Sequence, residues 1–379
     1  MECNVIVLFD GWSIVYQPNC PAAVHLQTLL DLLPESVQPV VALPGEAYQR
    51  LPASVQTILT VTENTSRGRL QWEQRSLEHL ARKAAAQVIH LFDSSPALFG
   101  KLPSVVSPAG SRLPDPFVDE PNFYKPPPVQ RGLAARLRQA LLLGGLSRIS
   151  RVLWPADLLE APADFPVVNL PMTVPQAFWQ PGVLPTDWPA PELPERYVLC
   201  HGVFDEFDLR LLLNAWSWAA ETIGEETPLV ILGLDRDASE SLSSLLSEYS
   251  LENSVLALPE LPLGTLAMVY GNSSAVFHLS PSSPWGDPLC LALAAGKPVV
   301  ALESRFSDWR LGSAAYLVRP ADSPAATGRA LGAALVTVIV EDSVAEPLAK
   351  AARQRSQEWQ SDRTRFVRSL GLLYAELAG

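Results

Sequence analysis

The chain alternates short, continuously apolar runs with longer segments whose apolar residues recur at helical spacing. The short runs are typical of strands buried on both faces of a parallel sheet, and the longer segments are typical of amphipathic helices. In the first half the predicted strands are residues 4–9, 40–43, 55–61, 87–92, 104–107, 151–154 and 167–170. The predicted helices of this half are residues 22–33, 70–83 and 133–143.

The second half repeats the same alternation. Residues 275–300 contain a strand, a Ser/Pro/Gly loop, a short apolar helix that stops at Gly296, and a second strand, which together form a βαβ unit. The other predicted strands are 196–200, 229–232, 255–258 and 316–318. The other predicted helices are 209–220, 241–249, 263–270, 325–340, 344–359 and 362–377. The repetition predicts an α/β protein with two Rossmann-like domains, and the Pro/Trp-rich run at 180–194 has the composition of the linker between them.

Ligands of such sheets bind outside the carboxyl ends of the strands, so the loops at those ends carry the candidate site. On the first sheet the candidates are Asp10, Gly11, Trp12, Asp93 and Ser94. On the second sheet they are Gly202, Gly233, His278, Ser282, Ser283, Trp285, Gly286 and Asp287. The last of these loops enters a helix N-terminus, whose free N–H groups and partial positive charge suit phosphate.

Several of these residues also have a purely structural interpretation. A buried, hydrogen-bonded histidine is the commoner state for His278, as it is for His90 and His201. Asp287 has the position of a residue favoured at a helix N-terminus. Tryptophans in Pro-rich surroundings, Trp285 among them, more often hold loops in place than stack on sugar rings. Both interpretations stay open for each residue.

Composition narrows the class of protein. A length of 379 residues suggests two or three domains, and a net charge of -12 argues against nucleic acid as a partner. The four cysteines lie far apart without metal-ligand spacing, so we expect no zinc site and a reducing, cytoplasmic setting. No apolar stretch is long enough to span a bilayer, and no signal peptide is recognisable. The segment 112–130 is Pro-rich without periodicity, and its structure cannot be derived from the sequence.

Five stretches together resemble the family 4 glycosyltransferases, which have the GT-B fold. They are RLQWEQRSLEHLARKAAAQVIHLF, YVLCHGVFDEFDLRLLLNAW, PWGDPLCLALAAGKPVVAL, GSAAYLVRPAD and the terminal QSDRTRFVRSLGLLYAEL. The resemblance implies two facing Rossmann-like domains and a C-terminal helix that crosses back to the first. The implied ranges are 1–185 for the acceptor-side domain, 186–360 for the donor-side domain and 361–379 for the returning helix.

The resemblance also implies a reaction. Family members transfer a sugar from a nucleotide-sugar donor to a glycan or small-molecule acceptor with retention of configuration, and no metal or other cofactor is expected. The residues that serve the donor in the family are altered here, however. Two glutamates with seven residues between them are replaced by Ser283 and Leu291, and the arginine and lysine for the diphosphate correspond to Val203 and to Phe207 or Asp208. Arg236 or Lys297 would have to compensate.

Two hypotheses follow. The first is an active glycosyltransferase with an altered donor site, in which Gly202, Gly233, Ser282, Ser283 and Gly286 supply the contacts. The second is a pseudoenzyme, a binding or scaffolding subunit that pairs with an active glycosyltransferase or with itself. A cleft that is open and positively lined would favour the first hypothesis, and a cleft filled by its own side chains would favour the second.

Overall fold

The computed structural model of the chain describes residues 4–46, 51–52, 54–92, 94, 96–109, 140–141, 143–157, 161, 164–179, 192–202, 206–234, 236–279 and 283–379. Five predicted features therefore lie wholly or mostly outside the described residues: the Pro-rich segment 112–130, the helix 133–143, the linker 180–194, and the candidate residues Asp93 and Ser282.

The first domain is built on a seven-stranded, wholly parallel sheet with the strand order β3-β2-β1-β4-β5-β6-β7. Its strands are β1 Val5–Asp10, β2 Val37–Leu43, β3 Gln56–Leu59, β4 Val88–Leu91, β5 Ser104–Val106, β6 Arg151–Pro155 and β7 Val167–Leu170. The strand order reverses between β1 and β4, and this switch point is where ligands of doubly wound sheets bind.

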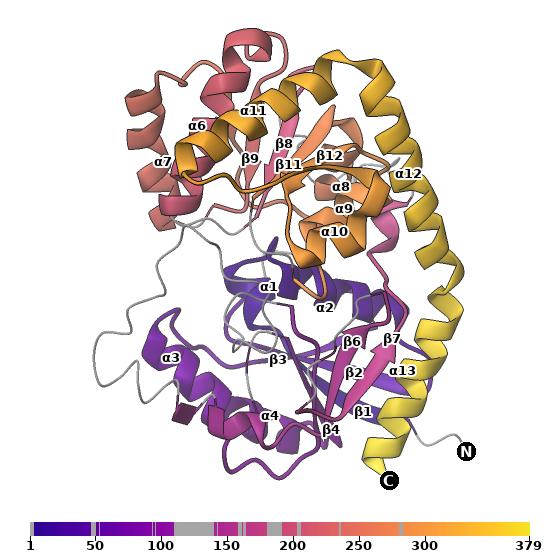
Figure 1. The fold of residues 1–379 in the computed structure, drawn as a ribbon. Helices are drawn as coiled ribbons and strands as arrows, with labels where there is room; N and C mark the ends of the chain where they lie inside the picture. The colour runs from indigo at the N-terminus through magenta and orange to yellow at the C-terminus, as the bar shows by residue number, and fades with distance from the viewer. Residues whose placement is uncertain are drawn as a thin grey trace.

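The second domain repeats this arrangement with six parallel strands in the order β10-β9-β8-β11-β12-β13. Its strands are β8 Val198–His201, β9 Leu229–Leu232, β10 Val255–Ala257, β11 Ala275–His278, β12 Val299–Leu302 and β13 Ala315–Val318. The switch point here lies between β8 and β11. Figure 1 shows the two domains one above the other, so that the α/β, GT-B-type architecture expected from the sequence is confirmed.

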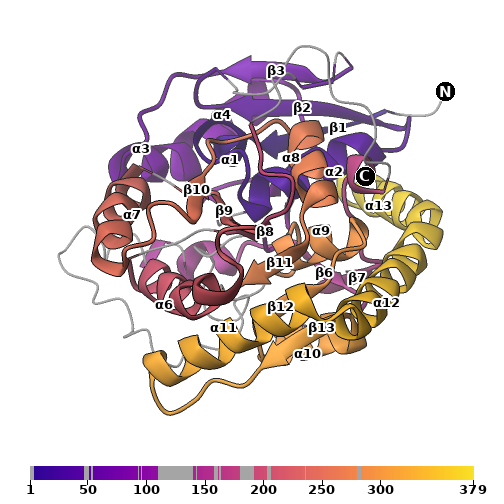
Figure 2. The ribbon, with the colours of Figure 1, turned by 90° about the horizontal axis from the view of Figure 1, so that it is seen from above.

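Helices cover both sheets. They are α1 Trp12–Tyr16, α2 Pro21–Leu32, α3 Ser66–Gln71, the π-helix η1 Trp72–Ser76, α4 Leu77–Lys83, the 3₁₀ helix η3 Gln176–Phe178, α6 Glu206–Ile223, α7 Arg236–Tyr249, α8 Leu263–Asn272, α9 Pro288–Ala294, α10 Arg305–Leu311, the 3₁₀ helix η4 Gly312–Ala314, α11 Pro324–Val340, α12 Asp342–Ser361 and α13 Arg363–Ala378. In the second domain α6, α7 and α11 share a hydrophobic cluster on one face of the sheet, whereas α8 and α9 lie on the other face (Figure 2).

Two helices were not predicted from the sequence. The turn expected at Trp12 is the first residue of α1, a helix too short to give a periodic pattern. The other is α10, which a capping box begins: Ser304 Oγ accepts from Ser307 N at 3.1 Å, and Ser307 Oγ accepts from Ser304 N at 2.7 Å. Both helices are shorter than the window in which helical spacing can be recognised.

The last helix returns to the first domain, as expected. Tyr374 of α13 is buried and its hydroxyl lies 2.6 Å from Nδ1 of His90 on β4. The ring of Tyr374 also meets Phe9 of β1 edge-on, with centroids 6.3 Å apart. Figure 1 shows α12 and α13 running along one side of both domains, so the two helices connect them.

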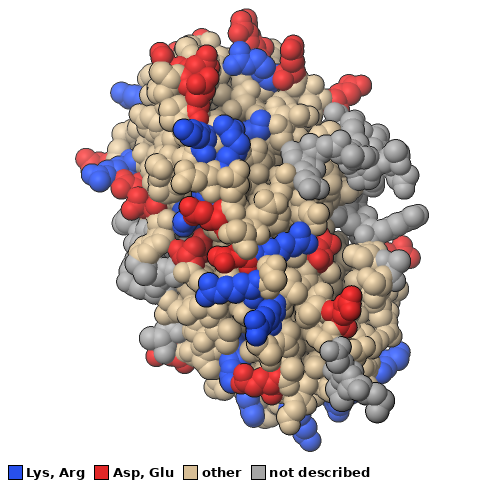
Figure 3. Space-filling view, turned by 90° about the vertical axis from the view of Figure 1, so that its right-hand side faces the viewer, with Lys and Arg blue, Asp and Glu red and all other residues tan. Residues whose placement is uncertain are grey.

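The outer surface of these two helices carries exposed side chains of both charges, and the acidic ones are Asp342, Glu346, Glu358 and Glu376. Exposed Lys350, Arg353, Arg365 and Arg368 lie on α12 and α13. The space-filling view of this side shows Lys and Arg side chains gathered near the middle of the molecule (Figure 3). For Arg365 and Arg368 the structure records no ion pair with any described residue.

Candidate functional site

At the switch point of the first sheet, Asp10 ends β1 and is 3% exposed. Its Oδ1 accepts hydrogen bonds from the backbone N of Trp12 at 3.0 Å and from Nε1 of Trp72 at 2.8 Å. Its Oδ2 accepts from Oγ of Ser94 at 2.8 Å. The structure thus brings three predicted site residues, Asp10, Trp12 and Ser94, into contact, but their polar atoms bond to one another.

A buried arginine completes this cluster. Arg69 of α3 is 1% exposed, its Nε donates to Oε1 of Glu73 at 2.6 Å, and one of its terminal nitrogens lies 3.8 Å from Oδ2 of Asp10. Its guanidinium also lies over the ring of Trp12, 4.8 Å from the centroid. Arg69 and Glu73 were not predicted as part of the site; their spacing of four residues on one helix face was the available signal.

Gly11 has a packing role. A Cβ at this position would lie 2.5 Å from the carbonyl oxygen of Ala42, which accepts a hydrogen bond from Gly11 N at 2.9 Å. No side chain fits between β1 and β2 at this point, so the close approach of the two strands explains this glycine without a ligand.

At the carboxyl ends of the strands of the second sheet, the backbone and side chains also pack against one another. Gly233, with a φ of +92°, lies against Gly202, whose carbonyl oxygen would be 2.3 Å from an added Cβ at Gly233. Beside them, His201 is 2% exposed, and its Nε2 donates to the carbonyl of Asn19 in the first domain at 2.9 Å. Because Nε2 carries the proton in that bond, Nδ1 accepts from the hydroxyl of Tyr270 at 2.7 Å.

The loop that enters α9 is held by its own polar groups. Asp287 is the N-cap of α9 and is fully buried; its carboxylate accepts from Ser283 N at 2.5 Å and from Leu289 N at 2.7 Å. Arg310 of α10, also fully buried, donates to the carbonyl of Ser283 at 2.7 Å and to that of Pro284 at 2.9 Å. Asp287 therefore has the helix-capping role that was one of its two interpretations from the sequence. Arg310 was not predicted as part of this loop.

Trp285, at the centre of this loop, inserts into the first domain. Its side chain is fully buried, its Nε1 donates to the carbonyl of Leu153 on β6 at 2.9 Å, and its ring stacks on His25 of α2 with centroids 4.8 Å apart. Phe366 of α13 meets it edge-on at 6.2 Å. The ring that could have stacked on a sugar thus fills the junction between the domains.

The absence of a side chain at Gly286 allows the loop before α9 to approach the backbone of the first domain. Its φ of +67° is in the left-handed region, and an added Cβ would lie 2.0 Å from the carbonyl oxygen of Pro21, the first residue of α2. The backbones of the two domains therefore touch at this position. Any larger residue would push the loop away from the first domain.

Asn19 fixes a second contact between the domains. Its side chain makes a reciprocal pair of hydrogen bonds with the backbone of Leu261, both 2.7 Å long, and its backbone N donates to Oε2 of Glu260 at 3.2 Å. Asn19 is 1% exposed, so these bonds are shielded from water. Neither Asn19 nor Glu260 shows a sequence signal, because an isolated Asn in a Pro-containing loop is indistinguishable from a turn residue.

The positions that correspond to the family's glutamates are not at an open surface. Leu291 is fully buried and belongs to a hydrophobic cluster that also contains Phe9, Val24 and Phe366. Ser283 is 9% exposed. This single cluster extends from the first sheet through α9 to α13, so the core is continuous across the junction. The confirmed burial of α9 on all sides agrees with its uniformly apolar sequence.

None of the remaining predicted positions that the structure describes places an exposed charged side chain at these strand ends. His278 ends β11 and is 3% exposed. Lys297 follows α9 and is partly buried; burial, and secondarily the charge of Arg353, lower its pKa. Val203 and Ser282 lie outside the described residues, as does Asp93, and nothing is described for the side chain of Arg236. Among the described residues, the structure records no arginine or lysine positioned for a diphosphate at the carboxyl ends of β8 and β11 other than the buried Arg310.

In the part of the chain that the structure describes, no three His, Cys, Asp or Glu side chains are grouped so that they could hold a metal ion. None of its helices has both the length and the apolar character needed to cross a bilayer.

The buried histidines make the stability of this junction dependent on pH. Burial lowers the pKa of His90 to about 3 and that of His201 to about 4. In the unfolded chain both groups titrate near 6.5, so acid protonates the unfolded state first. We expect the free energy of unfolding to fall as the pH is lowered from about 6.5 to about 4, by up to about 1.4 kcal/mol per pH unit for each histidine. Urea unfolding at a series of pH values measures this slope.

Two variants act as controls for the pH dependence. His79 is exposed, so His79→Gln should leave the slope unchanged. Burial raises the pKa of Glu260 to about 7, so its contribution is present below about 4.5 and is lost as the pH rises to about 7, opposite to the histidines. Glu260→Gln should therefore make the loss in acid steeper. A slope that is equal in His201→Gln and in the unsubstituted protein would contradict the assignment to His201.

Comparison with known proteins agrees with this architecture. Residues 191–313 match the family model described as glycosyl transferases group 1, which covers the strands and loops of the second switch point. A search of curated proteins finds no match. The resemblance to GT-B glycosyltransferases is thus confirmed for the second domain by sequence and for the whole chain by fold.

Three solved structures illustrate the likeness of the fold. WaaG, a glycosyltransferase involved in lipopolysaccharide biosynthesis, matches with a TM-score of 0.70 at 12% identity, covering 95% of this chain and 98% of its own. The sucrose-phosphate synthase of Thermosynechococcus elongatus matches with a TM-score of 0.66 at 15% identity, covering 98% and 100%. Alr3699/HepE of Anabaena, solved in complex with UDP and glucose, matches with a TM-score of 0.61 at 14% identity, covering 97% and 99%. At these identities the likeness is one of fold.

Proposed function

We propose that this chain is a non-catalytic protein of the GT-B glycosyltransferase type, a binding or scaffolding subunit that acts beside an active transferase. The observation that carries the proposal is the insertion of Trp285 between the domains, where it is fully buried and bonded to Leu153 of the first domain. The donor of an active transferase would have to enter between the two domains. In this chain the space is occupied by protein side chains.

The electrostatics of the described residues support the same conclusion. A nucleotide-sugar donor brings a diphosphate, whose charge has to be neutralised by cations or by free N–H groups. The guanidinium of Arg310 is committed to the carbonyls of Ser283 and Pro284. The first-turn N–H of Leu289 at the start of α9 is taken by the carboxylate of Asp287, which itself adds a negative charge.

The active transferase remains the second candidate, and its site would be the same loops in a more open arrangement. The match of residues 191–313 to a glycosyltransferase family model favours it, as does the position of Asp10 and of His278 at the two switch points. This candidate requires the contacts of Trp285, Gly286 and Asn19 to break before a donor enters. Retention of configuration and the identity of donor and acceptor belong to this candidate alone.

Binding of nucleotides distinguishes the two candidates. We expect UDP, GDP, ADP and TDP to leave the melting temperature of the protein unchanged, because Trp285, Gly286 and Asn19 hold the two domains in direct contact at the described junction. A donor site that is filled at about a hundred times its dissociation constant would stabilise the protein by about 2.7 kcal/mol. Thermal-shift and calorimetric titrations measure both outcomes.

The experiment has a positive control. The Anabaena protein that was solved with UDP has the same fold and should respond to UDP under identical conditions. A clear stabilisation of the present protein by any of the four diphosphates would overturn the proposal and favour an active enzyme. Release of free sugar from a nucleotide-sugar donor would do the same.

A further inference from the structure

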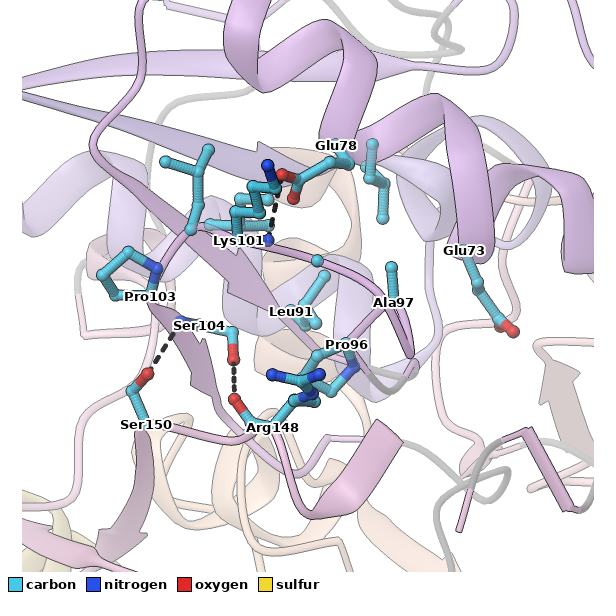
Figure 4. A pocket seen from close by; sticks show the side chains of 14 residues that line it. Glu73, Glu78, Leu91, Pro96, Ala97, Lys101, Pro103, Ser104, Arg148 and Ser150 are labelled. Atoms are coloured by element: carbon cyan, nitrogen blue, oxygen red, sulfur yellow. Dashed lines mark hydrogen bonds between the residues drawn. The ribbon is translucent and has the colours of Figure 1, made fainter. Parts of the chain in front are cut away.

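The first domain contains a cavity of about 270 Å³ that lies beside α4 and β4 (Figure 4). Part of its lining comes from η1 and α4, and part from the loops that lead into β5 and β6. Ser104 is the first residue of β5 and Ser150 directly precedes β6, so these walls stand at the amino ends of the strands. Glu73, whose partner Arg69 belongs to the Asp10 cluster, also lines the cavity, so the cavity borders the first switch point on that side.

The lining of this cavity combines apolar side chains with polar and charged ones. Leu77 of α4 and Ile89 and Leu91 of β4 are buried residues that line it. Lys101 and Arg148 stand at the rim with exposed side chains. Figure 4 shows the guanidinium of Arg148 reaching toward Pro96.

The rim has more free positive than negative charge. No carboxylate among the described residues forms an ion pair with the side chain of Lys101 or of Arg148. The nearest acid, Glu78, accepts a hydrogen bond from the backbone N of Lys101 at 3.1 Å. The other lining acid, Glu73, is bonded to Arg69.

Backbone contacts hold the rim in place. Ser104 Oγ donates to the carbonyl of Arg148 at 2.9 Å, and Ser104 N donates to Oγ of Ser150 at 3.2 Å. Arg148 is thereby anchored at the mouth of the cavity, and its long side chain is the part left free. A guanidinium that is fixed at its base can recognise a carboxylate or a phosphate with two parallel hydrogen bonds.

From this geometry we propose that the cavity binds a small organic anion, with its apolar body against Leu77, Ile89 and Leu91 and its carboxylate or phosphate between Lys101 and Arg148. A volume of 270 Å³ is equivalent to about nine water molecules, which is the size of a single aromatic or branched aliphatic acid. It is too small for a nucleotide-sugar. Binding at this cavity therefore does not depend on whether the protein binds a nucleotide-sugar donor.

The test uses four probes on the full chain: benzoate, phenyl phosphate, neutral benzamide and acetate. Benzoate and benzamide have the same shape and differ in charge, whereas acetate has the charge without the body. We expect benzoate or phenyl phosphate to bind at millimolar concentration in NMR titrations, and benzamide and acetate to bind about tenfold more weakly or more so. The ranking of benzoate against phenyl phosphate identifies the preferred head group.

Variants assign the binding to this cavity. Lys101→Gln combined with Arg148→Gln should weaken binding of the anion about tenfold and leave benzamide unaffected. The matched control, Arg365→Gln combined with Arg368→Gln, removes the same charge from α13 and should leave both probes unaffected. Ala97→Trp should block all four probes by filling the cavity.

Two results would overturn the proposal. One is an absence of binding by both anions in a protein that retains its circular dichroism spectrum and melting temperature. The other is equal anion binding by the rim variant and by the unsubstituted protein. If Ala97→Trp does not fold, the pair of surface-charge variants still decides the question, because neither removes a buried group.

Discussion

Leu291→Glu is expected to destabilise the protein by at least about 3 kcal/mol without creating affinity for a nucleotide-sugar. Leu291 is fully buried within a cluster of apolar side chains, so the new carboxylate would have neither water nor a cation to stabilise it. Chemical denaturation measures the loss, and isothermal titration with nucleotide-sugars measures the affinity. An open donor pocket predicts the opposite result, because a glutamate there could hold ribose hydroxyls.

Two companion variants make this result interpretable. Leu291→Met keeps the volume and the apolar character of the side chain and should cost less than about 1.5 kcal/mol. Leu291→Glu combined with Ser283→Glu restores both family carboxylates. Tighter nucleotide-sugar binding by this double variant at unchanged stability would mean that the donor site is eroded but usable, and the scaffold proposal would then be abandoned.

Trp285→Ala is expected to cost about 3–5 kcal/mol and to loosen the junction between the domains. The substitution removes the ring that stacks on His25, empties the space beside Phe366 and leaves the carbonyl of Leu153 without its donor. Denaturant unfolding gives the energetic loss. Small-angle scattering shows whether the radius of gyration increases, as it should when the two domains separate.

An exposed tryptophan provides the matched control. Trp309 on α10 is 37% exposed, and Trp309→Ala should cost clearly less than Trp285→Ala because more of its surface stays in contact with water in the folded protein. If Trp285→Ala were as mild as Trp309→Ala, the loop would not be holding the domains together. If Trp285→Ala instead gained affinity for UDP, the indole would be acting as a removable occupant of the donor site.

Much of the fold could be predicted from the sequence because parallel strands buried on both faces give uninterrupted apolar runs. The runs at 4–9 and 275–279 correspond to β1 and β11, and the two predicted C-terminal helices agree with α12 and α13 to within two residues at each end. Two short helices were missed, α1 of five residues and α10 of seven. Their identity depends on local capping and on packing rather than on periodicity.

The positions of the candidate residues in the fold could be predicted from the sequence, whereas the contacts that they make could not, and their role in a site stays a prediction. Strand ends and glycines identified Asp10, Gly11 and Gly286, and all three do lie at the carboxyl edge or at the domain junction. The sequence could not reveal that Gly286 touches Pro21, or that Arg310 reaches the carbonyl of Ser283, since these contacts join segments that are far apart in the chain. Whether a polar loop binds a ligand or another loop is decided by tertiary contacts.

The return of α13 bears on how the protein is made. During synthesis, His90 leaves the ribosome 284 residues before Tyr374, the hydroxyl that its Nδ1 meets in the folded protein. Until then the strip of the first sheet around Phe9 and His90 is uncovered, and a half-made chain exposes an apolar groove to the cell. The first domain is therefore translated first, but its fold is completed only when α13 has been synthesised. A stop codon before α13 should produce a chain that chaperones retain and proteases remove.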